Sequence, residues 1–192
     1  MSFKYDDFQV SNLSPEVLDR IAALIPAGSR ILEFGSGLGT RELCKRFDVV
    51  SIEHDLEFIN QFHENYIHTP LVDRYYELTG CRAAFNMGPF QAVLIDGPPA
   101  YRHDNRKARL GFQKLVSLVD EKTILVFDDI DRFWDCANFL LTFLRLRGGV
   151  MLVGGGQRRA GVLLRGPTRL QSFSRCLYAL GWTIAYGTTY GT

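Results

Sequence analysis

Short apolar runs alternate with amphipathic stretches along most of this 192-residue chain, and that alternation constrains the fold more than any other feature. The runs are apolar at successive positions, as expected of strands that are covered on both faces. The stretches between them carry apolar residues at helical spacing. Strands and helices that alternate in this way form a parallel sheet with helices on both faces. We therefore predict a doubly wound α/β fold with a mostly parallel sheet.

The pattern predicts five buried strands, six helices and a hairpin. The strands are expected at 29–34, 49–53, 66–72, 90–96 and 123–129. The helices are expected at 14–25 (with Ser14 as N-cap and Pro15 at its first position), 40–47, 56–66, 106–119 and 132–147. A hairpin around Gly154, Gly155 and Gly156 and a helix near 168–180 complete the prediction.

The chain has no internal repeat, low-complexity tract or linker, so we expect one domain over residues 1–192. We divide it into an N-terminal segment (1–13), a cofactor-binding core (14–130) and the C-terminal part of the sheet (131–192). No apolar run approaches the roughly 20 residues of a membrane span, and the N-terminus lacks a signal-peptide core. The four cysteines are scattered and form no C-x-x-C pair. We therefore expect a cytoplasmic protein with reduced thiols and no membrane partner.

Acidic residues end four of the five predicted strands. In open α/β sheets, ligands bind outside the carboxyl ends of the strands, so functional groups are expected there. The acidic strand ends are Glu33, Glu53, Asp96 and the pair Asp128 and Asp129.

The stretch LEFGSGLGT, residues 32–40, places three glycines between a strand and a helix. Glycine allows a tight turn and lets a ligand approach the backbone closely, although such a loop can also be a simple connection. Glu53 ends the next strand 18 residues past Gly35, where an acid would hold ribose hydroxyls. A dinucleotide fingerprint would need Gly or Ala at the position of Thr40. Glu33 instead suits a cationic ligand that carries an ammonium and a sulfonium.

The segment EFGSGLGT resembles the first motif of the class I (Rossmann-like) S-adenosylmethionine-dependent methyltransferases. SIEHD is similar to their acidic second strand end, and FQAVLIDGPP to their fourth-strand motif, so the resemblance covers roughly residues 14–130. It implies the strand order 3-2-1-4-5-7-6 and S-adenosylmethionine as methyl donor. It also implies contacts to the methionine moiety, to the ribose (Glu53) and to the adenine (His54 and Leu71). The implied cofactor-binding residues are Glu33, Gly35, Ser36, Gly37, Glu53, His54, Leu71 and Asp96.

Asp96 and the pair Asp128 and Asp129 follow strands that are neighbours in the predicted sheet. Two like charges ~4 Å apart repel by roughly 4 kcal/mol at an effective dielectric of ~20, so protonation, arginines or a cation must offset them. Mg²⁺ takes oxygen ligands and would suit such a cluster. The alternative is that one aspartate caps the following helix while the other pairs with Arg132.

This arrangement resembles the catechol-type metal-dependent O-methyltransferases, which place one Asp after the fourth strand and an Asp-Asn pair after the fifth. The resemblance implies that Asp96, Asp128 and Asp129 hold Mg²⁺ or a similar divalent cation, which binds the acceptor hydroxyl. Two departures are present, because Asp129 stands where that family usually has Asn and Pro99 stands at the place of its catalytic lysine. His103 is the candidate for the missing base.

We therefore predict a methyltransferase that acts on a small-molecule hydroxyl with the help of a divalent metal. The alternatives are a metal-independent methyltransferase with His103 or Asp96 as base, and a non-catalytic module that binds adenosylmethionine or a nucleotide. Arg102, Arg106 and Arg109 would share one helical face, which would suit an anionic acceptor; the alternative is that these residues balance the acidic strand ends or solvate a helix. The net charge of +1 speaks against nucleic acid. The oligomeric state stays open, a homodimer being one alternative.

Overall fold

The computed structural model describes residues 13–100, 103–146, 148–154, 159–164, 177–178 and 180–181. The strands are β1 (Arg30–Phe34), β2 (Asp48–Glu53), β3 (Tyr66–His68), β4 (Leu71–Val72), β5 (Tyr75–Tyr76), β6 (Ala92–Ile95), β7 (Ile124–Phe127), β8 (Gly149–Val153) and β9 (Ala160–Leu164). The helices are α1 (Pro15–Leu24), α2 (Leu38–Cys44), α3 (Leu78–Phe85) and α4 (Phe133–Leu146), with two 3₁₀ helices, η2 (Ala108–Lys114) and η3 (Val116–Leu118).

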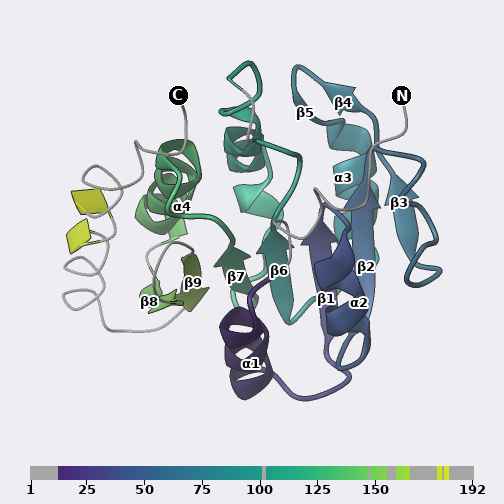
Figure 1. The fold of residues 1–192 in the computed structure, drawn as a ribbon, viewed down its shortest axis with the longest axis horizontal. Coiled ribbons are helices and arrows are strands. Elements are labelled where there is room, and N and C mark those ends of the chain that lie inside the picture. The colour runs from purple at the N-terminus through teal and green to yellow at the C-terminus, as the bar shows by residue number, and fades with distance from the viewer. Residues whose placement is uncertain are drawn as a thin grey trace.

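Seven of these strands form one sheet in the order β3-β2-β1-β6-β7-β9-β8 (Figure 1). The first five run parallel, and β9 is antiparallel to both β7 and β8. When only the strands of this sheet are counted along the chain, the order reads 3-2-1-4-5-7-6. The predicted doubly wound, mostly parallel α/β fold is confirmed.

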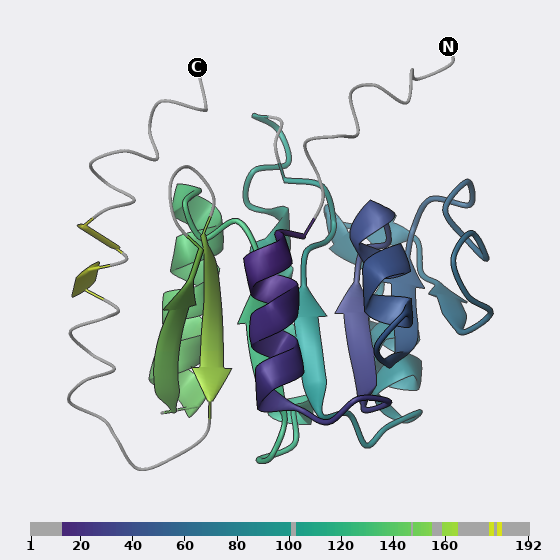
Figure 2. The ribbon, with the colours of Figure 1, turned by 60° about the horizontal axis from the view of Figure 1, so that its bottom comes forward.

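Helices cover both faces of the sheet, as predicted from strands that are apolar at successive positions. Figure 2 shows α1 and α2 on the near face and α4 behind the strands. Each face has its own apolar core, and neighbouring residues of one strand enter different cores: Ile31 packs with the α1 side and Leu32 with the α4 side. Because successive side chains of a strand point to opposite faces of the sheet, each strand contributes residues to both cores.

The predicted start of the first helix is confirmed at the level of single atoms. The backbone N–H of Val17 donates to the Ser14 hydroxyl (3.3 Å), and Pro15 occupies the first helical position. The helix at α4 and the hairpin of β8 and β9 also form as predicted, although the hairpin tip, residues 155–158, lies outside the described residues. Most of the helix expected near 168–180 lies outside them as well.

The helix predicted at 56–66 is wrong, because this segment forms turns. The backbone N–H groups of Phe58 and Ile59 bond three residues back, and Asn60 is left-handed at φ 60°. Leu56 is 70% exposed, so the apolar spacing that predicted the helix is not used to bury a face. Without that burial, a short helix has little to stabilise it.

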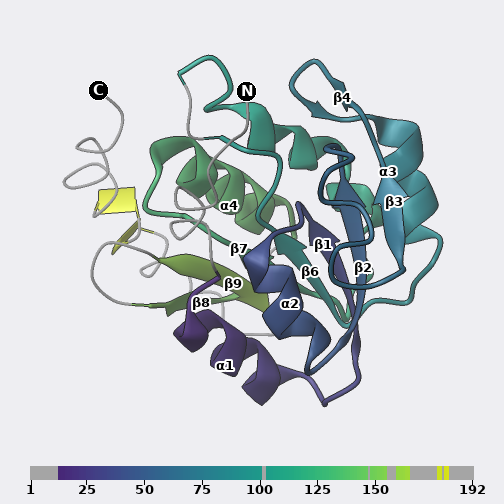
Figure 3. The ribbon, with the colours of Figure 1, turned by 45° about the vertical axis from the view of Figure 1, so that its right-hand side comes forward.

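The predicted third strand also ends early, at His68. Leu71 and Val72 instead pair with Tyr75 and Tyr76 in a separate antiparallel hairpin. Asp73 and Arg74 between them are both left-handed, which is the turn that two-residue hairpins favour. Figures 1 and 3 place this hairpin at the end of the molecule to which the parallel strands run.

The segment 106–119 is helical as predicted but contains 3₁₀ turns rather than an α-helix. Its buried side chains, which include Arg109, Phe112 and Leu115, still lie at the helical spacing that predicted the element. Gly111 packs against the ring of Tyr75, and any side chain there would collide with it. No helix within the described ranges is both long and apolar enough to cross a membrane.

Candidate functional site

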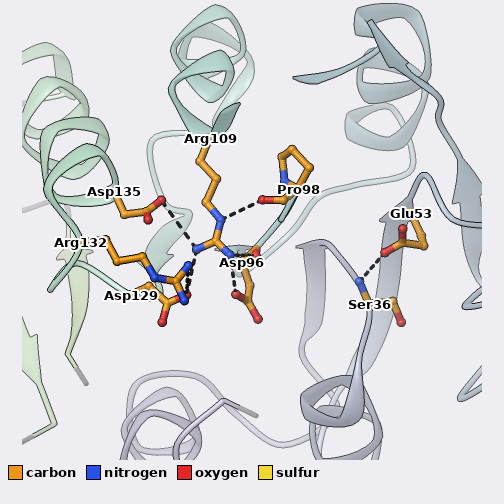
Figure 4. Close-up of polar contacts among 8 residues, drawn as sticks. All are labelled: Ser36, Glu53, Asp96, Pro98, Arg109, Asp129, Arg132 and Asp135. Atoms are coloured by element: carbon orange, nitrogen blue, oxygen red, sulfur yellow. Dashed lines mark hydrogen bonds and ion pairs between the residues drawn. The ribbon is translucent and has the colours of Figure 1, made fainter. Parts of the chain in front are cut away.

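The acidic strand ends lie side by side in the sheet, as the parallel topology requires. Strand β1 pairs with β2 on one side and with β6 on the other, and β6 pairs with β7. The carboxylates at the end of each strand therefore face one edge of the sheet. Figure 4 shows Glu53 and Ser36 on one side and the aspartates on the other. A ligand bound at this edge would contact both the glycine loop and the acidic cluster.

The loop after β1 requires glycine at its first position. Gly35 has φ +88°, and a Cβ there would lie 2.9 Å from Cα of Gly97, which follows β6. The contact is reciprocal, since a Cβ on Gly97 would lie 2.7 Å from Cα of Gly35. Two backbones thus touch where β1 and β6 end. A Cβ on Gly37 would meet nothing within 4 Å, so the loop is open on that side.

Glu33 is a buried acid that has hydroxyl partners in place of a cation. Its side chain is 3% exposed, and Oε2 accepts hydrogen bonds from Thr40 Oγ1 (2.9 Å) and Ser51 Oγ (2.7 Å). Burial raises the pKa of Glu33 to about 8, against the opposing effect of the two hydroxyls. At neutral pH the free protein therefore holds a mostly uncharged acid beside its glycine loop.

Glu53 is equally buried but stays ionised. Its Oε2 accepts from the backbone N–H of Ser36 (2.8 Å), and Oε1 accepts from the N–H groups of His54 (2.6 Å) and Asp55 (2.8 Å). Burial opposes ionisation, but these donors outweigh it, so the pKa of Glu53 lies below its ordinary value. The His54 ring nitrogen Nδ1 lies 2.7 Å from Oε1, and this contact raises the pKa of His54. Glu53 thus ties the glycine loop to the end of β2.

The three predicted metal ligands do come together. One ligand oxygen from each of Asp96, Asp128 and Asp129 lies within 4.8 Å of the others. Burial, together with the neighbouring carboxylates, raises the pKa of Asp96 to about 7 and that of Asp128 well above its ordinary range. Asp129 adopts a left-handed backbone at φ 57°, which turns the chain sharply after β7.

Two arginines already occupy this cluster. Arg109 lies 3.1 Å from Asp96 Oδ1, 3.2 Å from Asp129 Oδ2 and 3.7 Å from Asp135 Oδ1 (Figure 4). Arg132 lies 3.0 Å from the same oxygen of Asp129, so the predicted pairing of one aspartate with Arg132 is confirmed. Only 5% of Arg109 is exposed. Arginines, one of the three means of offsetting the carboxylate charge that the sequence left open, therefore supply part of the balance from within the protein.

The cluster suits a divalent cation by distance but is partly engaged by these arginines. Two oxygens on one Mg²⁺ are at most about 4.2 Å apart, so shifts of a few tenths of an ångström would suffice. However, Asp96 Oδ1 and Asp129 Oδ2 already accept from guanidinium groups. A guanidinium ~4 Å from a divalent ion would repel it by roughly 8 kcal/mol at an effective dielectric of ~20. A divalent ion bound through these two oxygens would therefore require Arg109 to move.

Two of the remaining candidates, Leu71 and His103, are exposed. Leu71 lies on β4 and is 39% exposed. His103 is exposed in the turn that precedes η2. The predicted basic face does not form as expected, since Arg106 is exposed while Arg109 is buried among acids, and Arg102 lies outside the described residues. The roles of Leu71 and His103 stay predictions.

Sequence reasoning missed Asp135, which is 3% exposed on α4 and contacts Arg109. Burial raises its pKa to about 7. A signal was present, because Asp135, Asn138 and Thr142 form a polar stripe at helical spacing on an otherwise apolar helix. All three are buried, and Gln113 on η2 donates to both Asn138 and Thr142. A buried polar stripe of this kind indicates polar partners on a facing element.

A scan of the sequence against protein-family models and a search among curated proteins found no match. Solved structures do align with the chain. A human methyltransferase-like protein 13 in complex with SAH aligns over 86% of this chain and 85% of its own, at 13% identity and a TM-score of 0.43. A methyltransferase-like protein from Silicibacter pomeroyi aligns over 88% and 95%, at 18% identity and a TM-score of 0.45.

The MycE methyltransferase from the mycinamycin biosynthetic pathway, in complex with Mg and SAH, aligns over 77% of this chain and 47% of its own. The identity is 16% and the TM-score 0.45. At these identities and TM-scores, the likeness carries no conclusion about the substrate or the mechanism of this chain.

Proposed function

We propose that this protein is an S-adenosylmethionine-dependent methyltransferase that acts on a hydroxyl group of a small molecule. One observation carries the proposal: a glycine loop with a buried acid and a cluster of carboxylates meet at the carboxyl ends of adjacent parallel strands. That edge of an open α/β sheet is where such folds bind ligands.

The donor side rests on Glu33, Glu53 and the loop between them. The open side of Gly37 leaves room for a ligand against the backbone. Glu33 lies next to this loop with hydroxyl partners, and a ligand that carries an ammonium and a sulfonium would supply the charge that favours its ionised form. Oε2 of Glu53 accepts one hydrogen bond from the described residues, so it can also accept from a ribose hydroxyl.

The acceptor side rests on the carboxylates that follow β6 and β7. In the proposed reaction, the acceptor oxygen attacks the methyl carbon, the carbon–sulfur bond breaks, and its electron pair stays on sulfur. The acceptor proton passes to a carboxylate. Asp96 suits this role, because burial raises its pKa to about 7, where it can accept a proton near neutral pH. The protein otherwise contributes mainly by holding the two reactants in line.

Two versions of this chemistry have support. The gathering of Asp96, Asp128 and Asp129 within 4.8 Å supports the predicted divalent cation, which would bind the acceptor oxygen and lower its pKa. The ion pairs of Arg109 and Arg132 with the same aspartates support the metal-independent alternative with Asp96 as base. We favour the second version, because it needs no displacement of a buried guanidinium.

Calorimetry with adenosylhomocysteine, adenosylmethionine and NAD tests the donor side directly. We expect heat with the first two and none with NAD. Transfer of a labelled methyl group is then screened over a panel of small hydroxylated acceptors, with carboxylated, phosphorylated and neutral members. Binding of NAD alone would end the proposal, and binding of adenosylhomocysteine with no turnover on any acceptor would favour a non-catalytic binding module.

A further inference from the structure

All three nitrogens of the Arg109 guanidinium contact oxygens within the site. Nε donates to the carbonyl of Pro98 (3.1 Å), and Nη2 donates to the carbonyl and to Oδ1 of Asp96 (the latter 3.1 Å). Nη1 faces Oδ2 of Asp129 (3.2 Å) and Oδ1 of Asp135 (3.7 Å). A guanidinium has five N–H groups; four of them make these hydrogen bonds, and the contact to Asp135 is an ion pair. Arg109 is therefore largely committed to oxygens of the site and has little donor capacity left for an anionic acceptor.

The backbone of Arg109 is also held in place, by a hydrogen bond from α4. Asn138 Nδ2 donates to the carbonyl of Arg109 (2.8 Å). Gln113 Nε2 in turn donates to Asn138 Oδ1 and to Thr142 Oγ1, both at 2.7 Å. This buried polar seam joins η2 to α4 and fixes the backbone from which the guanidinium extends. A side chain anchored at both ends has little freedom to leave the cluster.

We propose that Arg109 is the resident cation of the site, a positioning residue that occupies the place between Asp96 and Asp129 that a divalent metal would need. Its guanidinium offsets the carboxylate charge and fixes the direction of the Asp96 side chain. Its bonds to the carbonyls of Asp96 and Pro98 also fix the chain where it leaves β6. The role of Asp96 toward the acceptor rests on the proposed function, whereas the exclusion of metal does not.

The exclusion of metal can be measured without knowing the acceptor. Free Mn²⁺ is followed by electron paramagnetic resonance during titration with the wild-type protein and with Arg109→Met, which keeps the length of the side chain and removes its charge. We expect the variant to bind Mn²⁺ at least about 100-fold more tightly than the wild type, because a positive charge has left the cluster. Lys114→Met, an exposed charge on the same helix, should match the wild type.

Arg109→Lys separates charge from loosened packing. Its ammonium keeps the positive charge but cannot reproduce the five contacts. If Arg109 excludes metal by charge, the lysine variant should bind Mn²⁺ as weakly as the wild type, even if it is less stable. Gain of Mn²⁺ binding in both variants alike would overturn the proposal, as would no gain in Arg109→Met.

The wild-type titration decides the matter if Arg109→Met fails to fold, which circular dichroism reports. Stoichiometric Mn²⁺ binding by the wild type that is lost in Asp128→Asn would overturn the proposal, and its absence supports it. Calorimetry with adenosylhomocysteine on the same preparation reports separately on the proposed function. If the wild-type protein binds neither Mn²⁺ nor adenosylhomocysteine, the inference about Arg109 is supported and the proposed methyltransferase function is contradicted.

Discussion

Glu33 is placed where it destabilises the free protein, and Glu33→Gln should reveal this. Glu33 is 3% exposed, its hydrogen-bond partners among the described residues are two hydroxyls, and its carboxyl has a pKa of about 8 against an ordinary value of 4.5. The folded state therefore holds a proton that the unfolded state releases. Where the folded state binds more protons, stability falls as pH rises, here between about pH 4.5 and pH 8. Glutamine removes this penalty because it carries no titrating proton.

The size of the effect follows from the two pKa values. A shift of about 3.5 units costs the folded state roughly 4 kcal/mol at pH 8, and less than about 1 kcal/mol at pH 5. The stability of Glu33→Gln relative to the wild type should therefore rise by roughly 3 kcal/mol between pH 5 and pH 8. A constant cost of the amide in the Thr40 and Ser51 hydrogen bonds cancels in this difference, because it applies at both values.

Urea denaturation of both proteins at pH 5 and pH 8 measures the difference. The dependence of the unfolding free energy on urea concentration is compared to verify that both proteins unfold in the same way. Glu64→Gln serves as control, because that side chain is exposed and its replacement should give no such rise. The same variant should bind adenosylmethionine more weakly at pH 8, since it cannot supply a negative charge. Equal stability differences at the two pH values would refute the reasoning, because Glu33 would then be ionised in the folded protein.

Four further outcomes are expected. Glu53→Ala should weaken adenosylmethionine binding in calorimetry by roughly 1–3 kcal/mol, and unchanged affinity would remove Glu53 from the donor site. Methyl transfer should survive dialysis against EDTA, whereas activity that is lost and then restored by Mg²⁺ would support the metal-assisted version. Arg106→Ala should raise KM for an anionic acceptor and leave donor affinity unchanged. An acceptor screen in which neutral phenols are the best substrates would contradict this prediction. Arg109→Met should lose roughly 3–5 kcal/mol in urea denaturation, and a loss as small as that of Lys114→Met would mean that its ion pairs contribute little.

Local sequence was enough to predict the sheet and the edge at which the acids gather. Strands such as Ala92–Ile95 and Ile124–Phe127 are apolar at successive positions, and parallel topology brings their carboxyl ends to one edge whatever the packing details. Glycine at position 35 was likewise readable, because a strand that turns directly into a helix needs it. Apolar spacing alone failed at 56–66, where Leu56 stays exposed and no core accepts a helix.

The sequence by itself determined which residues stand at the strand ends, and only the tertiary structure decided what those residues pair with. Asp96, Asp128 and Asp129 were readable as a cluster because each directly follows a strand. Arg109 was readable only as one basic residue among several, since its partners lie 13 and 20 residues away in sequence and a third lies on α4. Strand periodicity acts over a few residues and leaves a local pattern. The ion pairs that join η2 to the end of β7 and to α4 depend on how separate elements pack, so no local pattern predicts them.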